Sequence, residues 1–129
     1  MEFNLQQGIN FVVEMIVDYS HTAISYGSGD VQVFATPAMI AQMENAAKST
    51  VENYLPEGYS TVGTEVNVKH IKATPIGMKV KFEAILEGFE GKRLNFKVTA
   101  WDEKGKIGEG SHTRYIINVE EFMNKLNNK

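Results

Sequence analysis

The chain has 129 residues, of which 43% are hydrophobic and 22% charged, and it contains no cysteine. These values predict one soluble domain over residues 1–129 in a cytoplasmic location, and they exclude disulfides, thiolate metal sites and thiol nucleophiles. A formal net charge of −3 argues against a general nucleic-acid-binding protein. No apolar run approaches the about 20 residues of a membrane span, and the N-terminus does not resemble a signal peptide.

The first elements expected in chain order are a strand, an irregular segment and a long helix. Residues 8–18 are rich in β-branched and aromatic side chains and predict a strand, whereas Ser, Gly and Asp in residues 19–33 predict a loop. Thr36 is expected at the helix N-cap and Pro37 at the first helical position, with residues 56–58 (PEG) ending the helix. Residues at helical spacing form one broad apolar face: Met39, Ile40, Met43, Ala46, Ala47, Thr50, Val51 and Tyr54.

After the helix, alternation of apolar and polar residues predicts four strands and then a short C-terminal helix. The expected strands are residues 64–70, 78–87, 94–101 and 107–118. Short turns join them, so neighbouring strands are expected to be antiparallel. In the first of these strands, Thr64, Val66, Val68 and His70 share the face expected to be buried. One long helix packed on a curled antiparallel sheet of about five strands is an α+β fold of two layers.

Three polar residues of this helix–sheet layer are candidates for chemistry. Glu44 lies at the boundary of the apolar helix face, where it either pairs with Lys48 or faces a cleft as a partly buried base. His70 continues the expected buried strand face, although a histidine there is more often structural than catalytic. Thr36 adds a hydroxyl at the helix N-terminus, where plain capping also explains it. A hydroxyl, a carboxylate and an imidazole suit acyl transfer, but spacing does not show that they meet.

Other residue patterns are less informative about function. The three histidines lack the paired spacing of a metal site, and no phosphate-binding glycine loop occurs. Gly108 and Gly110 fall within the last predicted strand and indicate a bend or a close backbone approach. A local group of basic residues suits a phosphorylated small molecule, and it comprises Lys69, Lys72, Lys79 and Lys81.

Three blocks of the sequence resemble the fluoroacetyl-CoA thioesterase-like family of hotdog-fold acyl-CoA thioesterases. The blocks are VFATPAMIAQMENAA, GTEVNVKHIKATPIGMKV and IGEGSHTRYIINVEEF, and they occur in the family's order between about residues 33 and 126. The catalytic Thr, Glu and His of the family match Thr36, Glu44 and His70. The resemblance implies that Glu44 acts as nucleophile or as base, that His70 carries protons, and that Thr36 polarises the thioester or orients the others.

The resemblance also implies the substrate and the assembly. It implies an acyl-CoA substrate with no separate cofactor, because coenzyme A is part of the substrate, and a homodimer with its sites at the subunit interface. Whether His70 serves Glu44 of its own chain or of a partner stays open. Residues expected to contact the substrate are Gly63, which matches a family glycine, Phe34, Met39 and Met43 for a short acyl group, and Lys72, Lys79 and Arg114 for coenzyme A phosphates. For these basic residues, a solvated strand face is the plainer alternative.

One segment departs from the family pattern. The namesake enzyme has a longer, aromatic-bearing segment between its first strand and its helix. Here the segment reads DYSHTAISYGSGDVQ, with Tyr19 and Tyr26 but no phenylalanine. Selectivity for fluoroacetyl-CoA is therefore not implied.

Three other functions compete with thioester hydrolysis. The first is a non-catalytic hotdog module that binds acyl-CoA or another small ligand, which would not need Thr36, Glu44 and His70 together. The second is a hotdog dehydratase, whose local motifs around an acid and a histidine are not seen here. The third is a helix-on-sheet interaction protein of the cystatin kind, which would not turn over any thioester.

Overall fold

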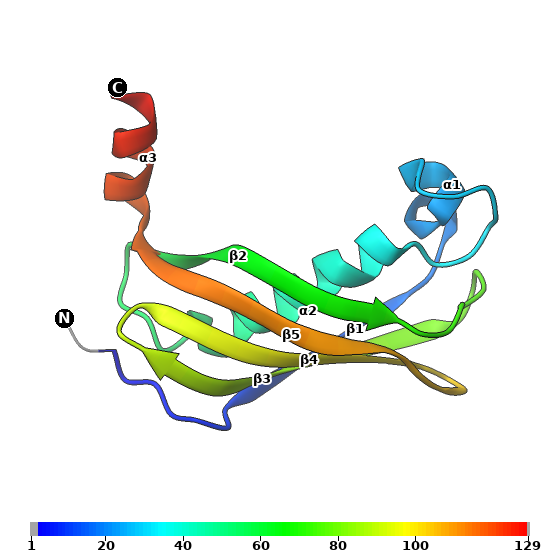
Figure 1. Ribbon diagram of the computed structural model, residues 1–129, viewed down its shortest axis with the longest axis horizontal. Helices are drawn as coiled ribbons and strands as arrows, with labels where there is room; N and C mark the ends of the chain where they lie inside the picture. The colour runs from blue at the N-terminus through cyan, green and yellow to red at the C-terminus, as the bar shows by residue number, and fades with distance from the viewer. Residues whose placement is uncertain (1–2, 129) are drawn as a thin grey trace.

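The computed structural model describes residues 3–128, so the first two residues and the last residue of the predicted domain lie outside it. The helical elements are the 3-10 helix η1 (Tyr19–His21), α1 (Ala23–Tyr26), α2 (Thr36–Glu52) and α3 (Val119–Asn127). The strands are β1 (Asn10–Ile16), β2 (Tyr59–His70), β3 (Lys79–Glu90), β4 (Arg93–Asp102) and β5 (Gly105–Asn118). They form one antiparallel sheet in the order β1-β3-β4-β5-β2, with α2 against one face (Figure 1).

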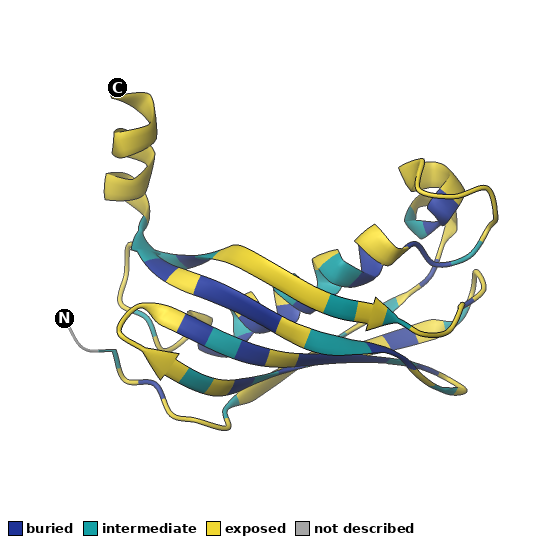
Figure 2. Cartoon of the chain, viewed as in Figure 1, coloured by how far each residue is buried: buried dark blue, intermediate teal, exposed yellow. Residues whose placement is uncertain are grey.

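The core lies between α2 and the inward face of the sheet. Seven α2 residues are buried, namely Ala38, Met39, Met43, Ala46, Ala47, Thr50 and Val51. They meet alternate residues of β3 and β4 that are at most 1% exposed, which gives the alternating bands of Figure 2. Alanine predominates on the buried helix face, so the helix can lie close to the sheet. In the described residues, no helix is long and apolar enough to cross a membrane.

Two glycines of β5 permit close approaches that a side chain would prevent. A Cβ atom built on Gly108 would lie 2.6 Å from Sδ of Met39, and one on Gly110 would overlap the carbonyl oxygen of Asn67. The close approach expected for these glycines is therefore confirmed. Gly108 lets α2 settle on the sheet, and Gly110 lets β2 lie against β5.

The predicted helix boundaries needed three corrections. The segment expected to be a loop contains η1 and α1. The N-cap of α2 is Ala35 rather than Thr36, which is the first helical residue, and Pro37 follows it. The helix ends at Glu52, before the predicted stop, so Tyr54 lies beyond it and is 41% exposed.

The predicted burial pattern of β2 was also wrong. This strand begins at Tyr59 and its pairing register with β5 shifts between Gly63 and Glu65. It is an edge strand, so its residues lie at the margin of the core rather than within it. Val66 is 37% exposed, and His70 is only partly buried.

We expect Gly110→Ala to lower the free energy of unfolding by about 2 kcal/mol, because the added methyl group forces β2 away from β5. Gly88→Ala is the matched control, because a Cβ on Gly88 of β3 meets no atom within 4 Å. Its effect should stay within about 0.5 kcal/mol. Urea unfolding of both variants measures the difference, and equal effects would contradict the packing described here.

Candidate functional site

The start of α2 is held between two loops by backbone hydrogen bonds. The N–H of Phe34 donates to the carbonyl of Thr74 at 2.9 Å, and the N–H of Ala35 donates to the carbonyl of His21 at 2.9 Å. Because Ala35 is the N-cap, the hydroxyl of Thr36 is not used to cap the helix. Its side chain is therefore free to make a tertiary contact.

That contact is to His70, the last residue of β2. Oγ1 of Thr36 lies 2.7 Å from Nδ1 of His70. The ring packs edge-on against Phe34, with centroids 6.4 Å apart. Burial lowers the pKa of His70, which favours a neutral imidazole able to accept a proton. Nε2 of His70 is buried and has no hydrogen-bond partner in the described part of the chain.

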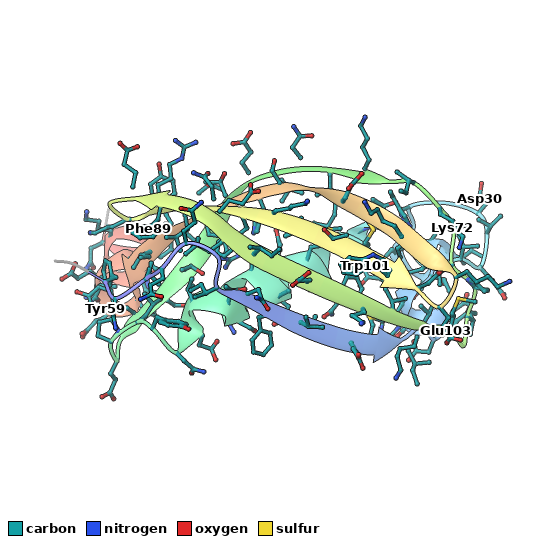
Figure 3. The ribbon with its side chains drawn as sticks, turned by 90° about the horizontal axis from the view of Figure 1, so that it is seen from below. Asp30, Tyr59, Lys72, Phe89, Trp101 and Glu103 are labelled. Atoms are coloured by element: carbon teal, nitrogen blue, oxygen red, sulfur yellow. The ribbon has the colours of Figure 1, made fainter. Side chains whose placement is uncertain are left out.

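A hollow of about 300 Å³ adjoins this pair. Its lining comes from the α1 region, the start of α2 and the turn after β2, and includes Ala23, Ser28, Phe34, Thr36, His70 and Lys72. Nζ of Lys72 lies 3.4 Å from Oδ1 of Asp102, and the Thr74 hydroxyl donates a hydrogen bond to Oδ2 of the same carboxylate at 2.8 Å. Figure 3 shows Lys72 at the same end of the molecule as Asp30, with Tyr59 at the other end. Lys72 is thus anchored beside the hollow while its side chain stays 40% exposed.

Glu44 lies in a second polar group, beneath Gly63. It does not pair with Lys48, whose ammonium contacts Glu52 at 2.9 Å instead. A Cβ built on Gly63 would lie 3.6 Å from Oε2 of Glu44 and 3.3 Å from Nη1 of Arg114. The absence of a side chain at Gly63 therefore lets a carboxylate and a guanidinium approach the same small space.

Arg114 is held firmly within this second group. It is 7% exposed, and its Nε donates to Oγ1 of Thr61 at 2.7 Å while Nη2 donates to the carbonyl of Thr61 at 2.9 Å. Burial lowers the pKa of Arg114, and the charge of Glu44 opposes that shift. The guanidinium is thus buried and bound to Thr61, and its expected contact with coenzyme A stays a prediction.

The structure brings together only some of the predicted site residues. Phe34, Thr36, His70 and Lys72 line one hollow, whereas Gly63, Glu44 and Arg114 form the other group. Thr36 and Glu44 are eight residues apart on one helix, which separates them by about 12 Å along its axis. Met39 and Met43 are at most 2% exposed and belong to the core instead of the hollow.

Sequence reasoning left His112 and Thr61 without a role. Both are buried and both contact Arg114. Strand parity was the one clue in the sequence, because His112 and Arg114 are two residues apart and project to the same face of β5. Parity does not show which residues of other strands they contact. Within residues 3–128, no group of three or more metal-ligating side chains was found.

The fold is that of the hotdog-fold thioesterases. A solved structure of the fluoroacetyl-CoA thioesterase FlK matches with a TM-score of 0.90 and 33% identity, covering 98% of each chain. A thioesterase superfamily member from Thermus thermophilus matches with a TM-score of 0.87 and 27% identity, covering 95% of this chain and 90% of that one.

The sequence comparisons give the family. A family model described as fluoroacetyl-CoA-specific thioesterase matches residues 17–120. The fluoroacetyl-CoA thioesterase of Streptantibioticus cattleyicolor is 40% identical over 98 residues, which cover 76% of this chain and 70% of that protein. The chain therefore belongs to the fluoroacetyl-CoA-specific thioesterase family and is a thioester hydrolase.

The partly buried His70 and the buried His112 predict how stability depends on pH. Burial lowers the pKa of His70 and of His112 below the ordinary value of 6.5. Below that value the unfolded chain binds protons that the folded chain does not, so the free energy of unfolding should fall as pH decreases from about 7 to about 5. Above it, this contribution is fully present.

His112→Gln removes one of these groups and should make the dependence shallower, by up to about 1.4 kcal/mol per pH unit. Urea unfolding of parent and variant at several pH values measures the slopes. Equal slopes would show that His112 does not resist protonation in the folded chain.

Proposed function

We propose that the protein hydrolyses short-chain acyl-CoA thioesters to the free acid and coenzyme A. The observation that carries the proposal is the Thr36–His70 pair, whose side chains line the hollow. The buried Nε2 of His70 has no hydrogen-bond partner among residues 3–128. Buried polar atoms normally have a hydrogen-bond partner, and a bound thioester would supply one. The activity named for the 40% identical relative agrees with this substrate class.

Hydrolysis needs water to replace the thiolate at the acyl carbon. Glu44 serves either as the nucleophile, through a mixed anhydride that water then cleaves, or as the base that removes a proton from water. His70, neutral at rest, takes up the proton that the attacking water loses, directly or through Glu44, and passes it to the leaving sulfur. Thr36 fixes the imidazole through its hydroxyl. Free N–H groups in the first turn of α2 stabilise the oxyanion. No cofactor takes part in these steps.

The hollow suggests which parts of the substrate go where. Its volume of about 300 Å³ lies at the lower end of the range for small-molecule pockets, which suits a short acyl group and the start of the pantetheine arm. Phe34 provides an apolar wall. Among the basic residues expected to contact coenzyme A, Lys72 lies at the rim of the hollow and is therefore the best placed to bind a phosphate.

With no cysteine in the chain, we propose a cytoplasmic location.

Glu44→Ala and His70→Ala should each reduce thiol release from acetyl-CoA and propionyl-CoA at least ~100-fold, the usual scale for losing an acid–base group. Glu52→Ala is the matched control, because Glu52 is an exposed carboxylate of the same helix. It should retain activity within about twofold.

Two outcomes would contradict the proposal. Unchanged turnover in both variants would remove the chemistry assigned to these side chains. Binding of acyl-CoA without any thiol release by the parent would favour the non-catalytic hotdog module instead.

We further propose that the active form is a homodimer and that each site combines two chains. Within one chain, Glu44 lies about 12 Å along α2 from Thr36. Among the described residues, β2 pairs on one side only, with β5, so its other edge offers free backbone groups. Antiparallel pairing of two β2 strands that sets Gly63 opposite His70 of the partner subunit brings a carboxylate and an imidazole into one site.

The C-terminal helix supports the same assembly. None of the residues of α3 is buried, and four apolar side chains repeat at helical spacing along it: Val119, Phe122, Met123 and Leu126. The helix projects beyond the β2 edge of the sheet (Figure 1). An apolar helix face in that position is suited to contact with a second copy.

Mixing the two inactive variants tests whether sites are shared. If Glu44 and His70 come from different chains, dissociating and reassociating equal amounts of Glu44→Ala and His70→Ala should recover about one quarter of parental activity. Half of the dimers are then mixed, and each mixed dimer holds one intact site. No recovery, with mixed dimers demonstrated by native mass spectrometry, would place each site within one chain.

A further inference from the structure

His112 is a buried histidine that the proposed reaction does not use. It is 2% exposed, and its ring lies 6.4 Å, centroid to centroid, from Phe96 of β4. Its Nδ1 lies 2.8 Å from the carbonyl oxygen of Glu65, and its Nε2 lies 3.2 Å from Nη1 of Arg114. Both ring nitrogens are therefore engaged in the interior of the protein.

These two contacts determine the protonation state of the ring. A carbonyl oxygen only accepts hydrogen bonds, so Nδ1 must carry the proton that is donated to Glu65. A guanidinium only donates, so Nε2 must be the unprotonated acceptor of the bond from Arg114. His112 is thus a neutral Nδ1–H tautomer. A second proton, on Nε2, would point its N–H group at an N–H group of Arg114 and replace the hydrogen bond with a repulsive contact.

The bond from Arg114 has a geometric consequence. Thr61 holds Nε and Nη2, while His112 holds Nη1. The guanidinium is therefore fixed at three of its nitrogens and cannot rotate about its last bonds. Nη1 donates to His112, and the same atom lies 3.3 Å from the position that a Cβ atom on Gly63 would occupy. Oε2 of Glu44 lies 3.6 Å from the same point.

We propose that His112 is a positioning residue, which holds the Arg114 guanidinium toward the Glu44 carboxylate across the gap at Gly63. This inference rests on the proposed function, because it assigns the catalytic carboxylate to Glu44. The positive charge attracts the partly buried carboxylate of Glu44 toward the gap, and Lys48 contacts Glu52 instead. Because the His112 ring is neutral, its acceptor nitrogen orients the guanidinium, and the ring does not attract the Glu44 carboxylate away from Arg114.

The surroundings of His112 suit this role. The groups facing it are Arg114 on its own strand, the Glu65 carbonyl from β2, the Phe96 ring from β4 and the Glu44 carboxylate from α2. Burial is the largest cause and lowers the pKa of His112; the hydrogen bond to the Glu65 carbonyl opposes it, the charge of Arg114 lowers the pKa further, and the charge of Glu44 raises it. A neutral acceptor is accordingly maintained at neutral pH.

Two conservative substitutions separate positioning from packing. His112→Asn retains a donor near Nδ1 for Glu65 but loses the acceptor for Arg114, whereas His112→Gln places an amide oxygen near Nε2 and retains it. With acetyl-CoA, we expect His112→Asn to lower kcat at least ~10-fold, the usual weight of a hydrogen bond to a charged group, with KM changed less than about threefold. His112→Gln should keep kcat within about threefold of the parent.

The pattern of the two variants decides the proposal. Equal losses of kcat accompanied by equal losses in thermal midpoint would show a packing role and overturn it. Full activity of His112→Asn would overturn it as well.

Nuclear magnetic resonance of the full chain gives a readout that does not depend on hydrolysis. Nitrogen-15 spectra should show His112 protonated at Nδ1 and unprotonated at Nε2 near pH 7, and an Nε2–H tautomer would overturn the proposal. The carbon-13 carboxyl signal of Glu44 should shift in His112→Asn and not in His112→Gln. A parent that shows these signals but releases no thiol would defeat the proposed function separately, leaving the positioning geometry established.

Discussion

The hydrogen bond between Thr36 and His70 joins the start of α2 to the end of β2, and it depends on how closely the helix lies on the sheet. His70 pairs in register with Gly108 of β5, and Gly108 in turn lies under the sulfur of Met39, one turn into the helix. A Cβ at position 108 would displace the end of the buried Met39 side chain and would lie 3.0 Å from the carbonyl oxygen of Lys69. The 2.7 Å contact at the hollow therefore lies beside a close glycine–methionine contact in the core.

Two environments along one helix separate the polar groups of the site. Thr36 lies at the exposed end of α2, whereas Glu44 lies two turns further on, beside the buried His112 and Arg114. Because α2 is continuous from Thr36 to Glu52, changes of side-chain rotamer do not close the separation of about 12 Å. This rigidity favours a reactive set completed by a second chain over one assembled within a single chain.

Much of the fold could be predicted because its signals are local. The helical spacing on α2 and the alternation along β3 and β4 reflect burial on one side, and the short turns correctly predict the pairs β3–β4 and β4–β5. The same rule was wrong for β2, which is joined to β3 by a short turn but pairs with β5. Thr36 was misjudged because a local capping rule was applied where a tertiary contact to His70 takes the hydroxyl. The buried setting of Arg114 was not predicted for a related reason, since neither periodicity nor composition shows that Thr61 and His112 hold its guanidinium.

The irregular start of β2 and the second polar group share one position. The register of β2 shifts between Gly63 and Glu65, whereas the exposure of the residues after it follows from the edge position of the strand. At the same position the missing side chain leaves room for Glu44 and Arg114 to approach each other. A regular strand with a larger residue at position 63 would satisfy the alternation rule and fill that space. The local departure from regular structure is thus what lets an acid lie beside the sheet without being expelled to solvent.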